Sequence, residues 1–217
     1  SNVVGSVLSA NNYTDVRDIV ITDVADMVDG IQIVQAANTG SIHLNVADNA
    51  DPILSNLSIS KTGTNLDVLS SLTVTSGNVS MSDAADIQGV TSYDSGASSY
   101  TISDTAGAVL AGTDTAIDAG VSAINVNGAV GAGVGVELGA LEDASFDTGF
   151  SADINFNVSD DASDIATALA GDNAVLNNAE SLVVDGGDTD MVGASDIQGV
   201  TSYDSGASSY TISDTAG

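Results

Sequence analysis

Clusters of aspartate are the part of this chain whose residue types and spacing could do chemistry. The two densest clusters each follow a short apolar run, and one of them encloses two adjacent glycines. Glycines permit a sharp turn on which carboxylates converge, and hard cations such as Ca²⁺ take oxygen ligands of this kind. We therefore predict Ca²⁺ sites at these clusters. The predicted ligands are Asp185, Asp188 and Asp190 in one, and Asp160, Asp161 and Asp164 in the other.

The competing interpretation of each aspartate is structural. Asp is a preferred N-cap residue, and its charge suits the positive end of a helix. For any single Asp this interpretation is favoured over metal binding. Taken together, however, the 30 acidic residues face only Arg17 and Lys61, which leaves most of the charges without a basic partner. This excess favours some binding of divalent cations.

The formal net charge of −28 excludes several classes of partner. No basic surface can form to neutralise nucleic-acid phosphates or to dock on an anionic membrane. Catalysis also has little support: His43 is the sole histidine, no GxSxG elbow surrounds any serine, and the glycine-rich run 128–135 does not fit GxGxxG. We predict that the protein is not an enzyme, that it contacts no nucleic acid and that it does not insert into a membrane.

A 22-residue stretch, DIQGVTSYDSGASSYTISDTAG, occurs twice without a change, at residues 86–107 and 196–217. Such self-similarity indicates repeat architecture. It divides the chain into two predicted modules, residues 1–107 and 108–217. Residues 108–111, which follow the first copy, resemble the stretch at residues 4–9, so the first module reads as the continuation of a preceding repeat. The chain is therefore expected to be a fragment of a longer repetitive protein.

Short runs with period-two alternation predict strands along both modules. They lie at 19–22, 42–46, 57–60, 72–75, 100–103, 123–126, 154–158, 182–184 and 210–213. Ala-rich segments that begin with Asp, at 23–28, 104–110 and 161–169, predict short helices between strands. Residues 55–69 and 70–84 read as two consecutive 15-residue coils, with Leu57 over Leu72 and Ile59 over Val74. The predicted fold is mainly β, an elongated, β-helix-like solenoid with short Ala-rich helices between strands. The alternative is a tandem of immunoglobulin-like β-sandwiches, which the module length near 110 residues would suit.

The segment YTISDTA, at 100–106 and 210–216, resembles repeats of large bacterial secreted surface proteins of adhesin-like, calcium-binding or S-layer-like type. Echoes at 21–25 and 158–162 extend the resemblance over much of the chain. The resemblance implies a secreted, cell-surface location and supports Ca²⁺ as the bound ion. One departure concerns the metal: the glycine-aspartate nonapeptides of calcium-binding β-rolls are absent.

Composition and resemblance together predict a structural role outside the cell. Cysteine is absent, so stability must come from repetition or metal and not from disulfides. We predict a repeat protein that self-associates into a fibre, stalk or surface-layer lattice and is stabilised by Ca²⁺. The alternative is an adhesin segment that binds glycan or a cell surface.

Overall fold

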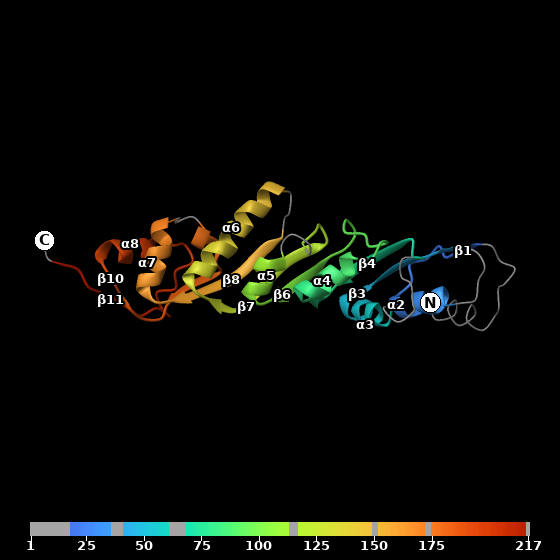
Figure 1. The fold of residues 1–217 in the computed structure, drawn as a ribbon, viewed down its shortest axis with the longest axis horizontal. Helices are drawn as coiled ribbons and strands as arrows, with labels where there is room; N and C mark the ends of the chain where they lie inside the picture. Colours follow the sequence, from blue (N-terminus) through green and yellow to red (C-terminus); the bar gives the residue numbers. More distant parts are fainter. Residues whose placement is uncertain are drawn as a thin grey trace. The chain divides into compact units, whose positions relative to one another are not determined.

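A computed structural model describes residues 18–35, 41–60, 68–112, 117–148, 152–171 and 175–215. In this part of the chain strands alternate with α-helices (Figure 1), and 40% of it is helical. The strand pairs run parallel. The fold is therefore α/β, and the predicted mainly β solenoid is wrong. The alternative of immunoglobulin-like sandwiches is wrong too, because the sheets of such sandwiches are antiparallel.

The elements follow one another as strand and helix in near-regular alternation. Their bounds are β1 Asp18–Val20, α2 Met27–Val34, β2 Ser41–His43, β3 Asn45–Asn49, α3 Ala50–Ser60, β4 Ser71–Ser76, β5 Asn78–Val79, α4 Met81–Gln88, β6 Tyr100–Asp104, α5 Ala106–Gly112, β7 Val121–Val130, α6 Ala132–Thr148, β8 Asp153–Asp160, α7 Ala162–Gly171, the 3₁₀ helix η2 Val175–Asn178, β9 Ser181–Val184, β10 Asp188–Thr189, α8 Met191–Gly199 and β11 Thr211–Ile212. The short helices predicted at 104–110 and 161–169 overlap α5 and α7, and the one predicted at 23–28 overlaps only the start of α2.

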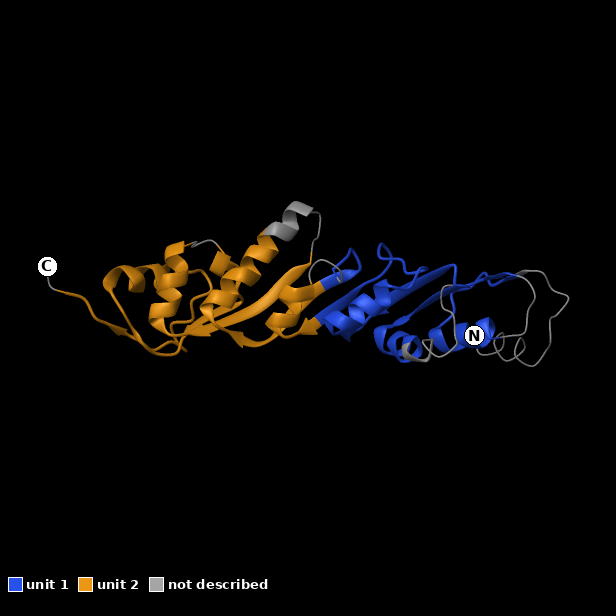
Figure 2. Cartoon of the chain, viewed as in Figure 1, with its two compact units in different colours: residues 1–102, 114–122 blue, residues 103–113, 123–217 orange. Residues whose placement is uncertain are grey.

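The parallel strands pair in the order in which the chain forms them. The largest sheet has the order β5-β6-β7-β8-β9, and the pairs β1-β2, β3-β4 and β10-β11 form two-stranded sheets. Parallel neighbours need a crossover connection, and here most crossovers contain a helix. The chain separates into two compact units, residues 1–102 with 114–122 and residues 103–113 with 123–217 (Figure 2). The module boundary after Gly107 stays a prediction.

Alternation along each strand separates a buried face from a polar one. In β8, Ile154, Phe156 and Val158 are at most 2% exposed, whereas Asn155 and Asn157 between them are half-buried. Helix α6 packs against β8 and against α7. The core therefore lies between the helices and one face of the parallel strands.

Residues 57–60 are helical and not a strand, which makes the predicted pair of 15-residue coils wrong. They form the end of α3. Asn49 accepts the backbone N–H of Asp51 on Oδ1 (3.1 Å) and Pro52 occupies the first turn, two features that favour a helix start. The helix then continues through Leu57 because its propagation is cooperative. Residues 61–67, which the predicted coils also used, lie outside the described residues.

None of the helices described is both long enough and apolar enough to cross a membrane.

Candidate functional site: acidic ends of the parallel strands

Three aspartates at or just after the ends of strands make the same pair of hydrogen bonds. In each, Oδ1 accepts the backbone N–H of the next residue, and Oδ2 accepts the N–H of the first residue of a helix earlier in the chain. For Asp48 these donors are Asn49 (2.8 Å) and Met27 (2.9 Å). For Asp160 they are Asp161 (2.9 Å) and Ala132 (2.9 Å). For Asp214 they are Thr215 (2.7 Å) and Met191 (3.3 Å).

This arrangement makes each carboxylate a cap supplied by a neighbouring strand. The first N–H groups of a helix have no partner within the helix, and the helix dipole is positive at that end. An Asp at the end of the adjacent strand satisfies one of these groups with a charged acceptor. A Glu side chain is one methylene longer and is not preferred at caps. The geometry therefore favours Asp over Glu at these three positions.

Most of the helices also carry a cap of their own. Asp26 accepts from Asp29 N–H (2.8 Å) ahead of α2, and Asp190 accepts from Gly193 N–H (2.7 Å) ahead of α8. Ser80 and Asp83 form a reciprocal capping box at α4. The structural interpretation of single aspartates therefore holds at these positions.

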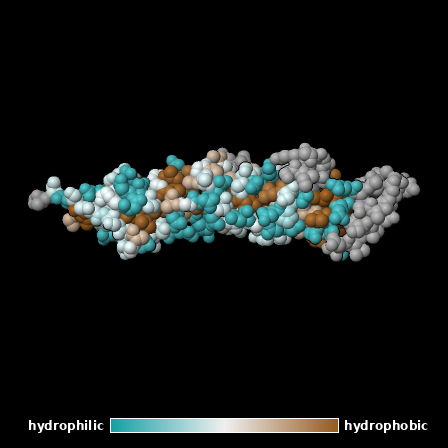
Figure 3. Space-filling model, turned by 90° about the horizontal axis from the view of Figure 1, so that it is seen from below, coloured by the Kyte–Doolittle hydropathy of each residue, from teal (hydrophilic) through white to brown (hydrophobic). Residues whose placement is uncertain are grey.

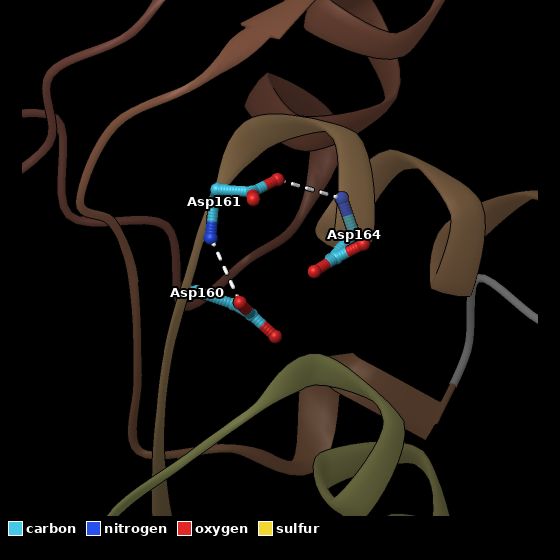
Figure 4. A group of neighbouring side chains, drawn as sticks. All are labelled: Asp160, Asp161 and Asp164. Carbon is cyan, nitrogen blue, oxygen red and sulfur yellow. Dashed lines mark hydrogen bonds between the residues drawn. The ribbon is translucent and has the colours of Figure 1, made fainter.

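The structure brings one predicted ligand set together. Asp160, Asp161 and Asp164 each offer a carboxylate oxygen, and the three oxygens lie within 4.8 Å of one another. Figure 4 shows Asp161 directing its carboxylate at the N–H of Asp164, where it caps α7 (3.1 Å). The hydrogen bond from Ser163, followed by the N–H of Asp164, lowers the pKa of Asp161. The charge of Asp161, followed by that of Asp160, raises the pKa of Asp164. A hard cation would relieve this repulsion between like charges.

The residues of the other predicted ligand set have separate positions and roles. Asp185 accepts a hydrogen bond from Ser159 Oγ (3.2 Å), Asp188 is exposed on β10, and Asp190 caps α8. Within the described residues these three do not form a group of close ligand oxygens. The turn at Gly186 instead uses its backbone, since the carbonyl of Gly186 accepts the N–H of Ala162 at the start of α7 (3.0 Å).

The remaining candidates among the described residues are a histidine and a small hollow. His43 is exposed at the end of β2. A hollow of about 150 Å³, lined by residues of α7, η2 and α8 such as Leu169, Asn177 and Asp196, is smaller than the pockets that usually hold small molecules. No protein-family model, curated protein or solved structure matches this chain. Its role is therefore inferred from its own residues.

Side-chain hydrogen bonds between neighbouring strands form a polar ladder that the sequence reasoning did not identify. On the outward face, Ser and Asn side chains pair across adjacent strands. The pairs are Ser71 with Asn45 (2.9 Å), Ser103 with Asn127 (2.8 Å), Asn155 with Asn125 (2.8 Å) and Ser181 with Asn157 (2.7 Å). The signal was the recurrence of Asn and Ser between apolar residues of the strands. Such pairs fix the register of neighbouring strands.

Proposed function

We propose that this chain is a structural component of an assembly outside the cell and not an enzyme. The observation that carries the proposal is the repeated cap from strand to helix at Asp48, Asp160 and Asp214. Asp48, Asp160 and Asp214 are each hydrogen-bonded to the start of a preceding helix, so these carboxylates hold a strand to the preceding strand–helix repeat. A chain built in this way gains length by adding further units.

The charge of the chain supports a location outside the cell and Ca²⁺ as the counterion. A formal charge of −28 repels itself at low ionic strength and is tolerated in the presence of salt and divalent cations. We place Ca²⁺ at Asp160, Asp161 and Asp164, because these carboxylates lie close enough to share one ion. The absence of cysteine agrees with a secreted protein that is stabilised without disulfides. The alternative role, an adhesin segment that binds glycan, stays a prediction.

Electron microscopy of the purified chain tests the structural role, and thermal unfolding tests the cation. At moderate salt, the melting temperature is expected to be higher in millimolar Ca²⁺ than in excess chelator, because an ion that binds the folded state stabilises it. The matched variant is Asp164→Asn, which removes the exposed ligand of the group and is expected to abolish most of the Ca²⁺-dependent shift. A melting temperature that does not respond to Ca²⁺ would remove the cation from the proposal. Particles that stay single under every condition would remove the structural role.

A further inference from the structure

One asparagine of the polar ladder is followed by glycine, whereas every other asparagine of the ladder is followed by valine or phenylalanine. Serine hydroxyls donate to the side-chain oxygens of Asn45 (2.9 Å), Asn127 (2.8 Å) and Asn157 (2.7 Å), so these three share one kind of hydrogen bond. Valine follows Asn45 and Asn157, and Gly128 follows Asn127. Asn127 and Gly128 also form the only Asn-Gly pair in the sequence. The ladder therefore holds matched asparagines that differ in the next residue.

The residue after an asparagine controls how readily the asparagine side chain reacts with its own main chain. In an Asn-Gly pair the glycine N–H gives its proton to solvent base, and the nitrogen bonds to the side-chain amide carbon. The amide nitrogen takes up a proton and leaves as ammonia, which closes a cyclic imide. Water then opens the imide at one carbonyl to aspartate or at the other to isoaspartate. A side chain on the following residue hinders the attack, and glycine has none.

The fold leaves this segment of main chain outside regular strand pairing with β8. The register of β7 and β8 shifts after Asn125 and pairing resumes at Ala129, so residues 126–128 stand opposite the single residue Phe156. A bulge of this kind leaves the additional residues unpaired. Gly128 has a φ of 80°, a conformation that glycine adopts without strain. Regular pairing with β8 therefore does not hold the main chain where the imide would close.

Solvent reaches the pair in the folded protein. Asn127 and Gly128 are both exposed, and a Cβ placed on Gly128 would meet no atom within 4 Å. In Figure 3 hydrophilic side chains form much of the surface of the second unit. Val158, the residue after Asn157, is by contrast only 1% exposed. The fold thus opens one asparagine of the ladder to water and base while it shields a matched one.

The hydroxyl of Ser103 is placed to promote the attack. It donates to Asn127 Oδ1 (2.8 Å) from β6, and both residues belong to the second compact unit. The side-chain oxygen gains negative charge while the nitrogen of Gly128 adds to the amide carbon. A hydrogen-bond donor already directed at that oxygen stabilises the charge as it develops. The same contact that pairs two strands therefore also polarises the reacting amide.

From these observations we infer that Asn127 and Gly128 form a site of self-modification, at which the folded chain converts Asn127 to aspartate and isoaspartate. The reaction needs water as its co-reactant and no enzyme, and the inference is independent of the proposed structural role. Each conversion adds one negative charge to a chain of formal charge −28. The isoaspartate product also places one additional methylene in the main chain of β7. The covalent structure of this strand therefore records the age of the molecule.

Peptide mass spectrometry of the unmodified, folded chain tests the site. The protein is held at neutral and at mildly alkaline pH for days, and samples are digested at mildly acidic pH, where the glycine nitrogen keeps its proton. Asn127 is expected to deamidate at least about tenfold faster than Asn157, which corresponds to a barrier lower by about 1.4 kcal/mol. The rate should rise with pH, because the attacking nitrogen must lose its proton. Methylation by an isoaspartyl methyltransferase should identify isoaspartate at Asn127.

The same incubation in concentrated urea gives the rate for the unfolded chain. Deamidation of Asn127 in the folded chain no faster than that of Asn157 would overturn the inference. A folded chain in which Asn127 reacts more than about tenfold slower than in urea, a barrier higher by about 1.4 kcal/mol, would show that the bulge protects the pair and would also overturn it. These comparisons use positions within one chain and do not depend on the folding of a variant.

Two serine variants test the contribution of the donor. Ser103→Ala is expected to slow deamidation of Asn127 by about 2- to 10-fold, the range for loss of a single hydrogen bond. Ser181→Ala removes the equivalent donor at Asn157 and should leave the rate at Asn127 unchanged. A rate at Asn127 that is equal or higher in Ser103→Ala would show that the hydroxyl does not promote the attack, and would overturn that part of the inference.

Discussion

Replacing Asp160 by alanine tests whether the acidic strand ends stabilise the fold or only add charge to it. The side chain accepts N–H groups from Ala132 and Asp161, each at 2.9 Å, and α6 begins after Gly131, which offers no side-chain cap. Loss of a cap costs about 0.5–2 kcal/mol, and loss of a charge at the helix N-terminus costs about 0.3–1 kcal/mol more. We expect Asp160→Ala to lower the free energy of unfolding by about 2 kcal/mol. In a chain of this size that corresponds to a fall in Tm of about 4–8 °C.

The opposing effect is relief of repulsion against Asp161 and Asp164, which salt screens. Asp153→Ala is the matched control, because it removes the same charge from the exposed start of the same strand. Thermal unfolding at low and high salt separates the two effects: the cost of Asp160→Ala should persist or grow with salt, whereas any gain from Asp153→Ala should shrink. Asp160→Asn keeps one acceptor oxygen and should lie between. Equal stability of the Asp160→Ala and Asp153→Ala chains would refute the capping argument.

Three further predictions use matched positions within the chain. Gly139→Ala should destabilise by about 1–3 kcal/mol, because a Cβ there would meet the carbonyl oxygen of Val175, whereas Gly133→Ala in the same helix has open space and should stabilise by up to about 1 kcal/mol. Tyr93→Phe should cost about 1 kcal/mol through loss of the hydrogen bond to Asp118, and Tyr203→Phe, at the less buried equivalent position of the second copy, should cost less. Burial, followed by the charge of Asp153, raises the pKa of Glu142 above its ordinary 4.5, so wild-type stability should fall as pH rises from that value through the raised pKa. Glu142→Gln should remove this fall, leaving the variant more stable than the wild type above the window.

Chemical denaturation checks the two matched pairs, and thermal unfolding between about pH 4 and pH 8, which brackets the ordinary pKa, checks Glu142. Equal effects of Gly139→Ala and Gly133→Ala would show that α6 can move away from η2. A larger loss from Tyr203→Phe than from Tyr93→Phe would contradict a stabilising contribution of the hydrogen bond from Tyr93 to Asp118. Parallel pH profiles of the wild type and Glu142→Gln would show that this carboxyl is hydrated.

Period-two alternation identified most of the strands, because it reports directly on which side chains a sheet buries. The run at 154–158 lies within β8, and its Ile154, Phe156 and Val158 are buried as alternation requires. The same signal failed at 57–60. There an Asn cap and a proline in the first turn of α3 outweigh a short alternating run. Local alternation over four residues does not separate a strand from the end of a helix.

The helices predicted at 104–110 and 161–169 overlap α5 and α7, whereas the long helix α6, which begins in a glycine-rich run, was not predicted. The run 128–135 contains the start of α6, and Gly135 is inside that helix. A Cβ on Gly135 would come within 2.7 Å of Val158 Cγ2, so close packing against β8 explains the glycine. Such a neighbour, 23 residues away along the chain, is not visible in the sequence.

Of the two aspartate clusters predicted as ligands, the structure brings one together and separates the other. Asp160, Asp161 and Asp164 are brought together because the end of a strand and the first turn of a helix are adjacent in the chain. Asp185 and Asp188 are separated by the turn at Gly186 and Gly187, both of which have positive φ (152° and 78°). That turn directs a carbonyl toward α7 and not the carboxylates toward one another.

The identity of the two 22-residue copies has a consequence for how the chain folds. Each copy docks on a nearly identical strand, SLTV at β4 or SLVV at β9, so the native pairing and an exchanged one have similar local contacts. During synthesis this ambiguity does not arise, because the first copy can dock before the second copy has been made. The copies are 110 residues apart, and at about 5–20 residues per second the first has roughly 5–20 s to dock before the second exists. Refolding from denaturant gives both copies an equal start, so kinetic partitioning into exchanged and interlinked chains should occur there and not on the ribosome.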